Sequence, residues 1–204
     1  MKINKLHKSF GFVILILIID QIFKICVKTT MEIGQEYNVI GNWFILHFTE
    51  NNGMAFGMEF GGNTGKIILT VFRVFAAIGI GWYLVRLSRK NAPTGLLICI
   101  AMIMAGAIGN IIDSAFYGMI FSDSYGHIAS IFPDGGGYAP FLKGKVVDML
   151  YFPIIDGHFP SWFPLWKGEY FIFFRPVFNI ADSSITTGVL MLIFFQRRYF
   201  KKIA

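Results

Sequence analysis

Four stretches of mostly apolar residues divide the chain, and more polar segments separate them. They cover residues 9–27, 66–85, 95–113 and 176–195. Because a helix rises ~1.5 Å per residue, about 20 such residues cross the ~30 Å hydrocarbon core of a bilayer. The pattern therefore predicts four membrane-spanning helices. The first stretch follows the basic start "MKINKLHK". No small-x-small cleavage site follows it, so we interpret it as a retained helix.

The polar segments predict a small amount of external structure. Between the first two stretches, "NWFILHFTENNGMAFGMEF" partly alternates apolar and polar residues and contains Asn-Gly, which indicates short strands and turns. Residues 114–175 form a long connection rich in Gly, Pro and aromatic residues, and such aromatic residues favour the membrane interface. We expect a single domain over residues 1–204. Its predicted class is an all-α membrane protein with four transmembrane helices, a small β cradle and an extended external loop on the outer face.

Composition and charge strengthen the membrane interpretation and predict an orientation. Hydrophobic residues make up 55% of the chain and charged residues 15%, values that are unusual for a soluble domain. Basic residues cluster before the first span, between the second and third, and after the fourth. They are Lys2, Lys5, Lys8, Arg86, Arg89, Lys90, Arg197, Arg198, Lys201 and Lys202. Because basic loops stay in the cytoplasm, both termini should be cytoplasmic. The net charge of +6 suggests contact with membrane lipids, and no basic-aromatic pattern indicates nucleic acid.

Polar residues within the spans fall at one level, near the outer surface. The groups are Asp20 and Lys24 in the first span, Arg73 in the second, Asn110 and Asp113 at the end of the third, and Asn179 and Asp182 at the start of the fourth. Ionisable groups at membrane depth are costly and normally line a bundle interior or a wet cavity. A bundle that used polar groups only for packing has no reason to confine them to one leaflet. We therefore expect a functional site just below the outer surface.

Each of these residues also has a structural interpretation. Asp20 and Lys24 are spaced i, i+4 and can pair on one helix face. Arg73 is equally well explained as a buried counter-ion or a lipid head-group contact. Asn110 and Asn179 can bridge helices by hydrogen bonds.

Carboxylate chemistry is the reaction type that the residues favour. The four histidines are scattered and form no His-Glu-x-x-His pair, so we expect neither a catalytic metal nor a cofactor. No Gly-x-Ser-x-Gly elbow or phosphate-binding Gly-Lys-Ser/Thr loop is present. Two close carboxyl groups share one proton, so one can act as a base while the other acts as an acid. From the residues alone, Asp113, Asp148 and Asp182 are equal candidates for such a pair.

Several motifs resemble those of the lipoprotein signal peptidases, the signal peptidase II family. They are "DQIFK", "ENNGMAFG", "GNIID", "VVDM" and "FNIADSSITTG", in the family's order and over most of the chain. The resemblance implies a four-helix bacterial inner-membrane aspartyl endopeptidase whose site lies near the periplasmic face. It further implies cleavage of prolipoproteins on the N-terminal side of a cysteine that carries diacylglycerol.

The resemblance also implies roles for individual residues. Asp148 of "VVDM" and Asp182 of "FNIAD" match the catalytic pair. The supporting or substrate-contacting positions are matched by Asp20, Lys24, Asn52, Gly53, Asn110, Asp113 and Asn179. We add Arg73 to this group because it lies at the same level. The chain departs from the family pattern at Ser114, where relatives usually have Arg, and in an enlarged external stretch on both sides of Asp148.

Two other classes of protein remain as alternatives. A small proton-coupled transporter would also bury aspartates, but it should show repeat symmetry and polar groups spread across the midplane. A non-catalytic assembly subunit would explain the small-residue packing positions Gly79 to Gly81 and Ala101 to Ala105. It would not explain a layer of carboxylates.

Overall fold

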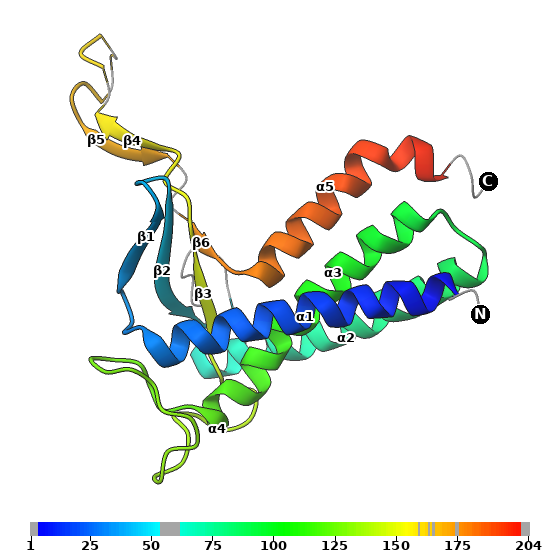
Figure 1. The fold of residues 1–204 in the computed structure, drawn as a ribbon, viewed down its shortest axis with the longest axis horizontal. Coiled ribbons are helices and arrows are strands. Elements are labelled where there is room, and N and C mark those ends of the chain that lie inside the picture. Colours follow the sequence, from blue (N-terminus) through cyan, green and yellow to red (C-terminus); the bar gives the residue numbers. More distant parts are fainter. Residues whose placement is uncertain are drawn as a thin grey trace.

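The computed structural model is a helical bundle with a small sheet across one end (Figure 1). It describes residues 4–53, 62–158, 160–162, 164, 166–173 and 176–200. The long helices are α1 (Lys5–Thr30), α2 (Gly62–Arg89), α3 (Thr94–Ile112) and α5 (Ile180–Phe200). The start of α1 and the end of α5 lie at the same end of the bundle, opposite the sheet.

Three described helical stretches are long and apolar enough to cross a membrane: Lys5–Thr30, Thr64–Arg89 and Thr94–Ile120. Helix α5 has 21 residues but is not among them. Its first turns contain Asp182 and several Ser and Thr residues, and its last turn contains Arg197 and Arg198. The chain is thus a mostly helical protein with three candidate membrane-spanning helices and a small antiparallel sheet. The fourth span stays a prediction.

Helix α5 begins later than the apolar pattern suggested, at Ile180 instead of residue 176. The cause is a reciprocal cap at its first turn. The Asn179 side-chain Oδ1 accepts a hydrogen bond from the Asp182 backbone N–H at 2.9 Å, and Asp182 Oδ2 accepts one from the Asn179 N–H at 3.4 Å. Such a pair satisfies two N–H groups that a helix start leaves unpaired. Asp182 therefore lies in the first turn of α5, where the apolar pattern had placed it six residues inside.

The third helical stretch ends later than residue 113. After α3 the chain continues as a π-helical turn, η2 (Asp113–Tyr117), and a short helix, α4 (Gly118–Ile120). Backbone N–H groups of the following connection bind this segment: Gly144 donates to the Ser114 carbonyl at 2.9 Å and Leu142 to the Ala115 carbonyl at 3.3 Å. The connection therefore starts after Ile120, because tertiary hydrogen bonds support a helix end that the apolar pattern does not reveal.

The sheet contains four antiparallel strands in the order β1-β2-β3-β6. They are β1 (Glu36–Ile40), β2 (Phe44–Asn51), β3 (Val146–Tyr151) and β6 (Val177–Phe178). Asp148 of β3 pairs with Thr49 of β2. Strands β4 (Ile155–His158) and β5 (Tyr170–Phe173) form a separate hairpin that projects from the sheet (Figure 1). The predicted external loop therefore contains strands β3, β4 and β5. Strand β6 follows it and leads directly into α5.

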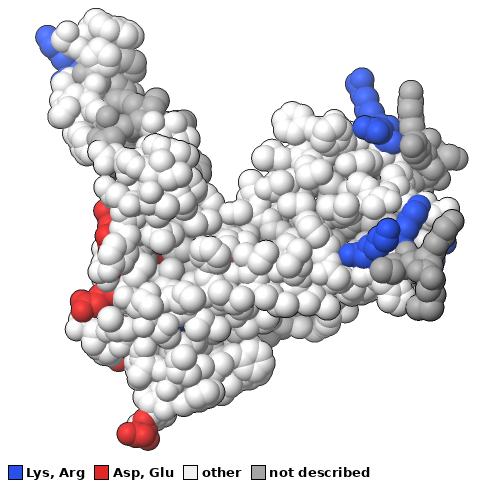
Figure 2. Space-filling model, viewed as in Figure 1, with Lys and Arg blue, Asp and Glu red and all other residues white. Residues whose placement is uncertain are grey.

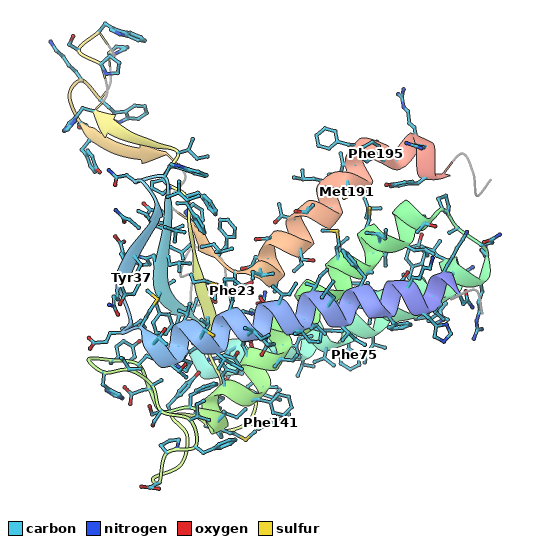
Figure 3. All side chains as sticks on the ribbon, in the orientation of Figure 1. Phe23, Tyr37, Phe75, Phe141, Met191 and Phe195 are labelled. Carbon is cyan, nitrogen blue, oxygen red and sulfur yellow. The ribbon has the colours of Figure 1, made fainter. Side chains whose placement is uncertain are left out.

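The surface of the bundle suits a bilayer. Phe75 on α2 is 68% exposed and Phe195 on α5 is 44% exposed (Figure 3). On the face shown in Figure 2, Lys and Arg gather where α1 begins and α5 ends and also lie at the tip of the projecting hairpin, while Asp and Glu lie at the sheet end. Charge is therefore separated along the helices, as the one-sided distribution of basic residues in the sequence predicts.

This separation generates a topology prediction. Lys8 in α1 and Asp134 in the connection after α4 are both exposed, at opposite ends of the molecule. In a Cys26→Ser background, we expect a membrane-impermeant thiol reagent on intact cells to label Asp134→Cys and not Lys8→Cys. Cys99 is buried and should not react with the reagent. Labelling at position 8 in place of position 134 would reverse the orientation.

Candidate active site

A fully buried lysine lies at the centre of the polar layer. The Lys24 Nζ is 3.0 Å from Asp20 Oδ2 and 2.8 Å from Asp113 Oδ2, and it donates to Asn110 Oδ1 at 3.0 Å. The expected i, i+4 pair is confirmed, and it belongs to a larger cluster. Lys24 supplies the cation for Asp113, while the Ser114 hydroxyl donates to the Asn110 carbonyl at 3.0 Å.

Both carboxylates of this cluster also accept a backbone hydrogen bond from another element. Asp20 Oδ1 accepts from the Ala181 N–H at 2.9 Å, in the first turn of α5. Asp113 Oδ2 accepts from the Val147 N–H at 3.3 Å, in β3. Ala181 precedes Asp182, and Val147 precedes Asp148. The buried ion cluster therefore fixes the backbone next to each candidate catalytic aspartate.

Two asparagines connect those aspartates. Asn110 Nδ2 donates to Asp182 Oδ1 at 2.8 Å. Asn179 Nδ2 lies 2.7 Å from Asp148 Oδ1 and 3.2 Å from Asn110 Oδ1. The bridging role expected for both amides is confirmed. Asp148 and Asp182 thus contact one continuous amide network, although they are 34 positions apart in the chain.

The two aspartates have different environments. Asp148 is only 4% exposed, and burial, followed by the nearby Asp182, raises its pKa to about 8. The amides of Asn179 and Asn51 oppose this rise because they donate to the carboxylate. Asp182 is half-buried in the first turn of α5, where the helix dipole favours negative charge. Near neutral pH, burial therefore favours the protonated form of Asp148, which lies next to Asp182 at the start of α5.

The turn after β2 completes one side of the site. The Asn51 side chain donates through Nδ2 to Asp148 and accepts through Oδ1 from the Gly53 N–H. Arg73 of α2 donates to the Gly53 carbonyl, and its buried Nη1 has no hydrogen-bond partner among the described residues. The Arg73 guanidinium also interacts electrostatically with the site carboxylates, most strongly with Asp182. The structure thus links Gly53 and Arg73 to the aspartates through Asn51.

Asn52, which the motif comparison had selected, has different contacts. Its Oδ1 accepts from Lys66 Nζ at 3.0 Å, and Lys66 also donates to the Lys143 carbonyl at 2.9 Å. The side chain against Asp148 is that of Asn51. Adjacent asparagines in "ENNG" give no basis for choosing between them until the strand register is known. A direct role of Asn52 toward substrate stays a prediction.

Gln21 is a second residue that the sequence interpretation missed. Its Nε2 donates to Asp113 Oδ1 at 2.9 Å, and its Oε1 accepts from the Tyr117 hydroxyl at 3.1 Å. Its position beside Asp20 in an apolar helix was the available signal. Gly109 of "GNIID" was another, because a Cβ there would lie 2.8 Å from Asp20 Oδ2. Glycine at this point lets α1 and α3 approach closely enough for the cluster to form.

A second buried ion pair anchors the enlarged connection after α4. Lys28 pairs with Glu50 and donates to Ser124 Oγ at 2.8 Å. The Lys28 Nζ also lies 5.5 Å from the Phe121 ring centroid and 5.1 Å from that of Tyr138. Because Glu50 precedes Asn51, the connection is attached to β2 beside the residue that contacts Asp148.

The described residues contain no group of three or more His, Cys, Asp or Glu side chains that could hold a metal ion. The geometry therefore offers carboxyl groups, amides and a guanidinium as its chemical groups. Such a set can activate water and stabilise a developing negative charge.

Comparisons with known proteins agree on one family. Residues 12–197 match the family model for signal peptidase (SPase) II. A lipoprotein signal peptidase from Porphyromonas gingivalis is 53% identical over 90% of this chain and 80% of its own length. One from Amoebophilus asiaticus is 38% identical over 95% of this chain and 79% of its own length. A solved structure described as a bacterial membrane enzyme has 26% identity and a TM-score of 0.58, covering 94% of this chain and 88% of that chain.

The buried cluster leads to a stability prediction. Lys24→Met leaves Asp20 and Asp113 buried without their cation, and breaking a buried ion pair in this way typically costs about 3–5 kcal/mol. We expect a lower thermal unfolding temperature and a lower yield of detergent-purified protein. Lys8→Met, an exposed change on the same helix, should have almost no effect. Equal stability of the two variants would show that the cluster does not support the fold.

Proposed function

The chain belongs to the signal peptidase II family and is therefore an aspartic peptidase, and we propose that Asp148 and Asp182 form its catalytic pair. The observation that carries this proposal is the amide network that joins the two carboxyl groups. Asn179 donates to Asp148, Asn110 donates to Asp182, and the two amides lie 3.2 Å apart. Asp113, the third candidate, is instead paired with Lys24.

In this mechanism the two carboxyl groups have different starting states. The charged Asp182 takes a proton from water as that water attacks the scissile carbonyl carbon. The protonated Asp148 donates a hydrogen bond to the carbonyl oxygen and later gives its proton to the leaving amine. Since burial raises the pKa of Asp148 to about 8, it still holds this proton at neutral pH.

The substrate follows from the family. Signal peptidase II removes signal peptides from prolipoproteins, and we propose cleavage on the N-terminal side of a cysteine that carries diacylglycerol. The apolar surfaces of α2 and α5 suit a lipid-embedded substrate. The unpaired Arg73 Nη1 is placed to bind a substrate carbonyl, and its contact with Gly53 would hold the turn after β2 against the peptide.

We propose a location in the bacterial inner membrane with both termini in the cytoplasm. Basic residues lie at the end of the bundle opposite the sheet (Figure 2), which supports a site near the periplasmic face. Helix α5 would be the fourth span, with its polar first turn at the site. Asp20, Lys24, Asn110, Asp113 and Asn179 then position the catalytic pair. A proton-coupled transporter is not favoured, because family membership and the single polar layer both support a peptidase.

The direct test is cleavage of a matched pair of precursors by the purified protein. One precursor carries diacylglycerol on its cysteine and the other does not. We expect mass spectrometry to show a single cut before the cysteine of the lipidated precursor only. Cleavage of both precursors, or a cut elsewhere, would contradict the proposed specificity.

Substitution of the aspartates tests the proposed pair. We expect Asp148→Asn, Asp182→Asn and the double variant to lose turnover almost equally, by at least about 10³-fold, because coupled catalytic groups are strongly non-additive. Binding of a lipopeptide should largely survive. Asp113→Asn should lower yield or activity only partially. An inactive, well-folded Asp113→Asn together with an active Asp148→Asn would transfer the catalytic role to Asp113.

The adjacent asparagines provide a matched test of the Asp148 environment. The proposed acid must be protonated, so activity should fall as pH rises through about 8, where Asp148 loses its proton. Asn51→Ala removes a hydrogen-bond donor that favours the charged carboxylate, so the pKa of Asp148 should rise. The loss of activity at alkaline pH should therefore move to higher pH. Asn52→Ala should leave the pH at which activity is lost unchanged. A shift with Asn52→Ala and none with Asn51→Ala would refute the contact.

A further inference from the structure

A shallow apolar groove lies on the bundle away from the candidate active site. It encloses about 500 Å³ and is lined by α2 residues from Val74 to Val85 and α3 residues from Met104 to Ile111, with Phe10 of α1. Gly81 lies where α2 crosses α3, and a Cβ there would be only 3.6 Å from Met104 Sδ. The missing side chain deepens the groove. From Val74 to Val85 a helix advances about 16 Å, close to half of the ~30 Å hydrocarbon core.

A cationic pocket of about 390 Å³ adjoins one end of this groove. Trp82 and Val85 line both spaces, and Arg86, Arg89 and Lys90 complete the second. The Arg86 guanidinium carbon lies 5.3 Å from the centroid of a Trp82 ring, which holds the cation beside the apolar groove. Together the two spaces form an apolar groove of about one-leaflet length with positive charge at one end.

Among the residues that the structure describes, the three cations form no ion pair. None of the ion pairs between described residues includes Arg86, Arg89 or Lys90. The sequence from Gly62 to Ile112 contains no Asp or Glu at all. An anion at the mouth of the groove would therefore meet only attractive charge from α2, α3 and the turn between them.

We propose that the groove and the cationic pocket form a binding site for one anionic glycerophospholipid. An acyl chain lies along α2 from Val85 toward Val74, and the head-group phosphate contacts Arg86, Arg89 and Lys90. Charge complementarity selects this occupant over a zwitterionic lipid, whose ammonium group would be repelled by the same cations. The site lies at the basic end of the bundle and is independent of the catalytic proposal.

Trp82 lines both parts of the site and can report its occupant. With Trp43, Trp162 and Trp166 changed to Phe, Trp82 is the sole tryptophan. The protein is reconstituted in vesicles of brominated phosphatidylcholine, which quenches tryptophan on contact. Unbrominated phosphatidylglycerol is then added, and unbrominated phosphatidylcholine serves as the control. We expect phosphatidylglycerol to restore Trp82 fluorescence at a few mole percent, whereas phosphatidylcholine should restore it only in proportion to dilution.

Two double variants identify the cations responsible. Arg86→Gln/Arg89→Gln should lower the preference for phosphatidylglycerol about 30-fold, since each cation near a membrane surface raises anionic-lipid affinity about fivefold. Arg197→Gln/Arg198→Gln removes the same charge from the end of α5 and should keep the preference. In the single-tryptophan protein with all its cations intact, identical recovery curves for the two lipids would overturn the proposal. Equal loss in both double variants would overturn it too, because the attraction would then be a general surface effect.

Discussion

The positive charge of the buried Lys24 is the constraint on which the site depends. A lysine without solvent contact is stable only when carboxylates surround it, and Lys24 has one from α1 and one from the end of α3. Each carboxylate also accepts a backbone hydrogen bond from another element: Asp20 accepts from an N–H of α5, and Asp113 accepts from an N–H of β3. One cation therefore determines how two helices, a helix start and a strand meet, and the proposed catalytic aspartates directly follow the fixed residues in sequence.

The same burial that organises the site opposes stability at Asp148. Its pKa of about 8 lies above the ordinary value of 3.8, so the folded protein keeps a proton that the unfolded chain releases. The contribution of Asp148 to stability is therefore lost progressively as pH rises from about 4 through about 8. A carboxyl group held protonated at neutral pH is useful to an aspartic peptidase as an acid. The surrounding amides and the Lys24 cluster stabilise the fold and offset the stability that Asp148 loses as pH rises.

The apolar pattern was sufficient for the helices because their length and hydrophobicity are local properties of the chain. The polar layer was also predictable, since Asp20, Lys24 and Asn110 stand out in apolar stretches. Choosing the proposed catalytic pair needed family motifs, because only long-range contacts join Asp148 to Asp182: β3 pairs with β6 just before α5, and two asparagine side chains connect the carboxyl groups. The starts and ends were less predictable. The α5 cap at Asn179 and the π-helical turn at Asp113 depend on partners far away in the sequence.

Asp148 is proposed to hold the proton of a carboxyl pair with Asp182, and infrared spectroscopy can measure that proton directly. A pH titration of the substrate-free protein should show a protonated carboxyl band at neutral pH that disappears near the pKa of about 8 and is missing in Asp148→Asn. A band that disappears well below neutral pH would mean that Asp148 is ionised at neutral pH, and a band that persists unchanged in Asp148→Asn would assign the proton to another group; either result would contradict the proposed acid.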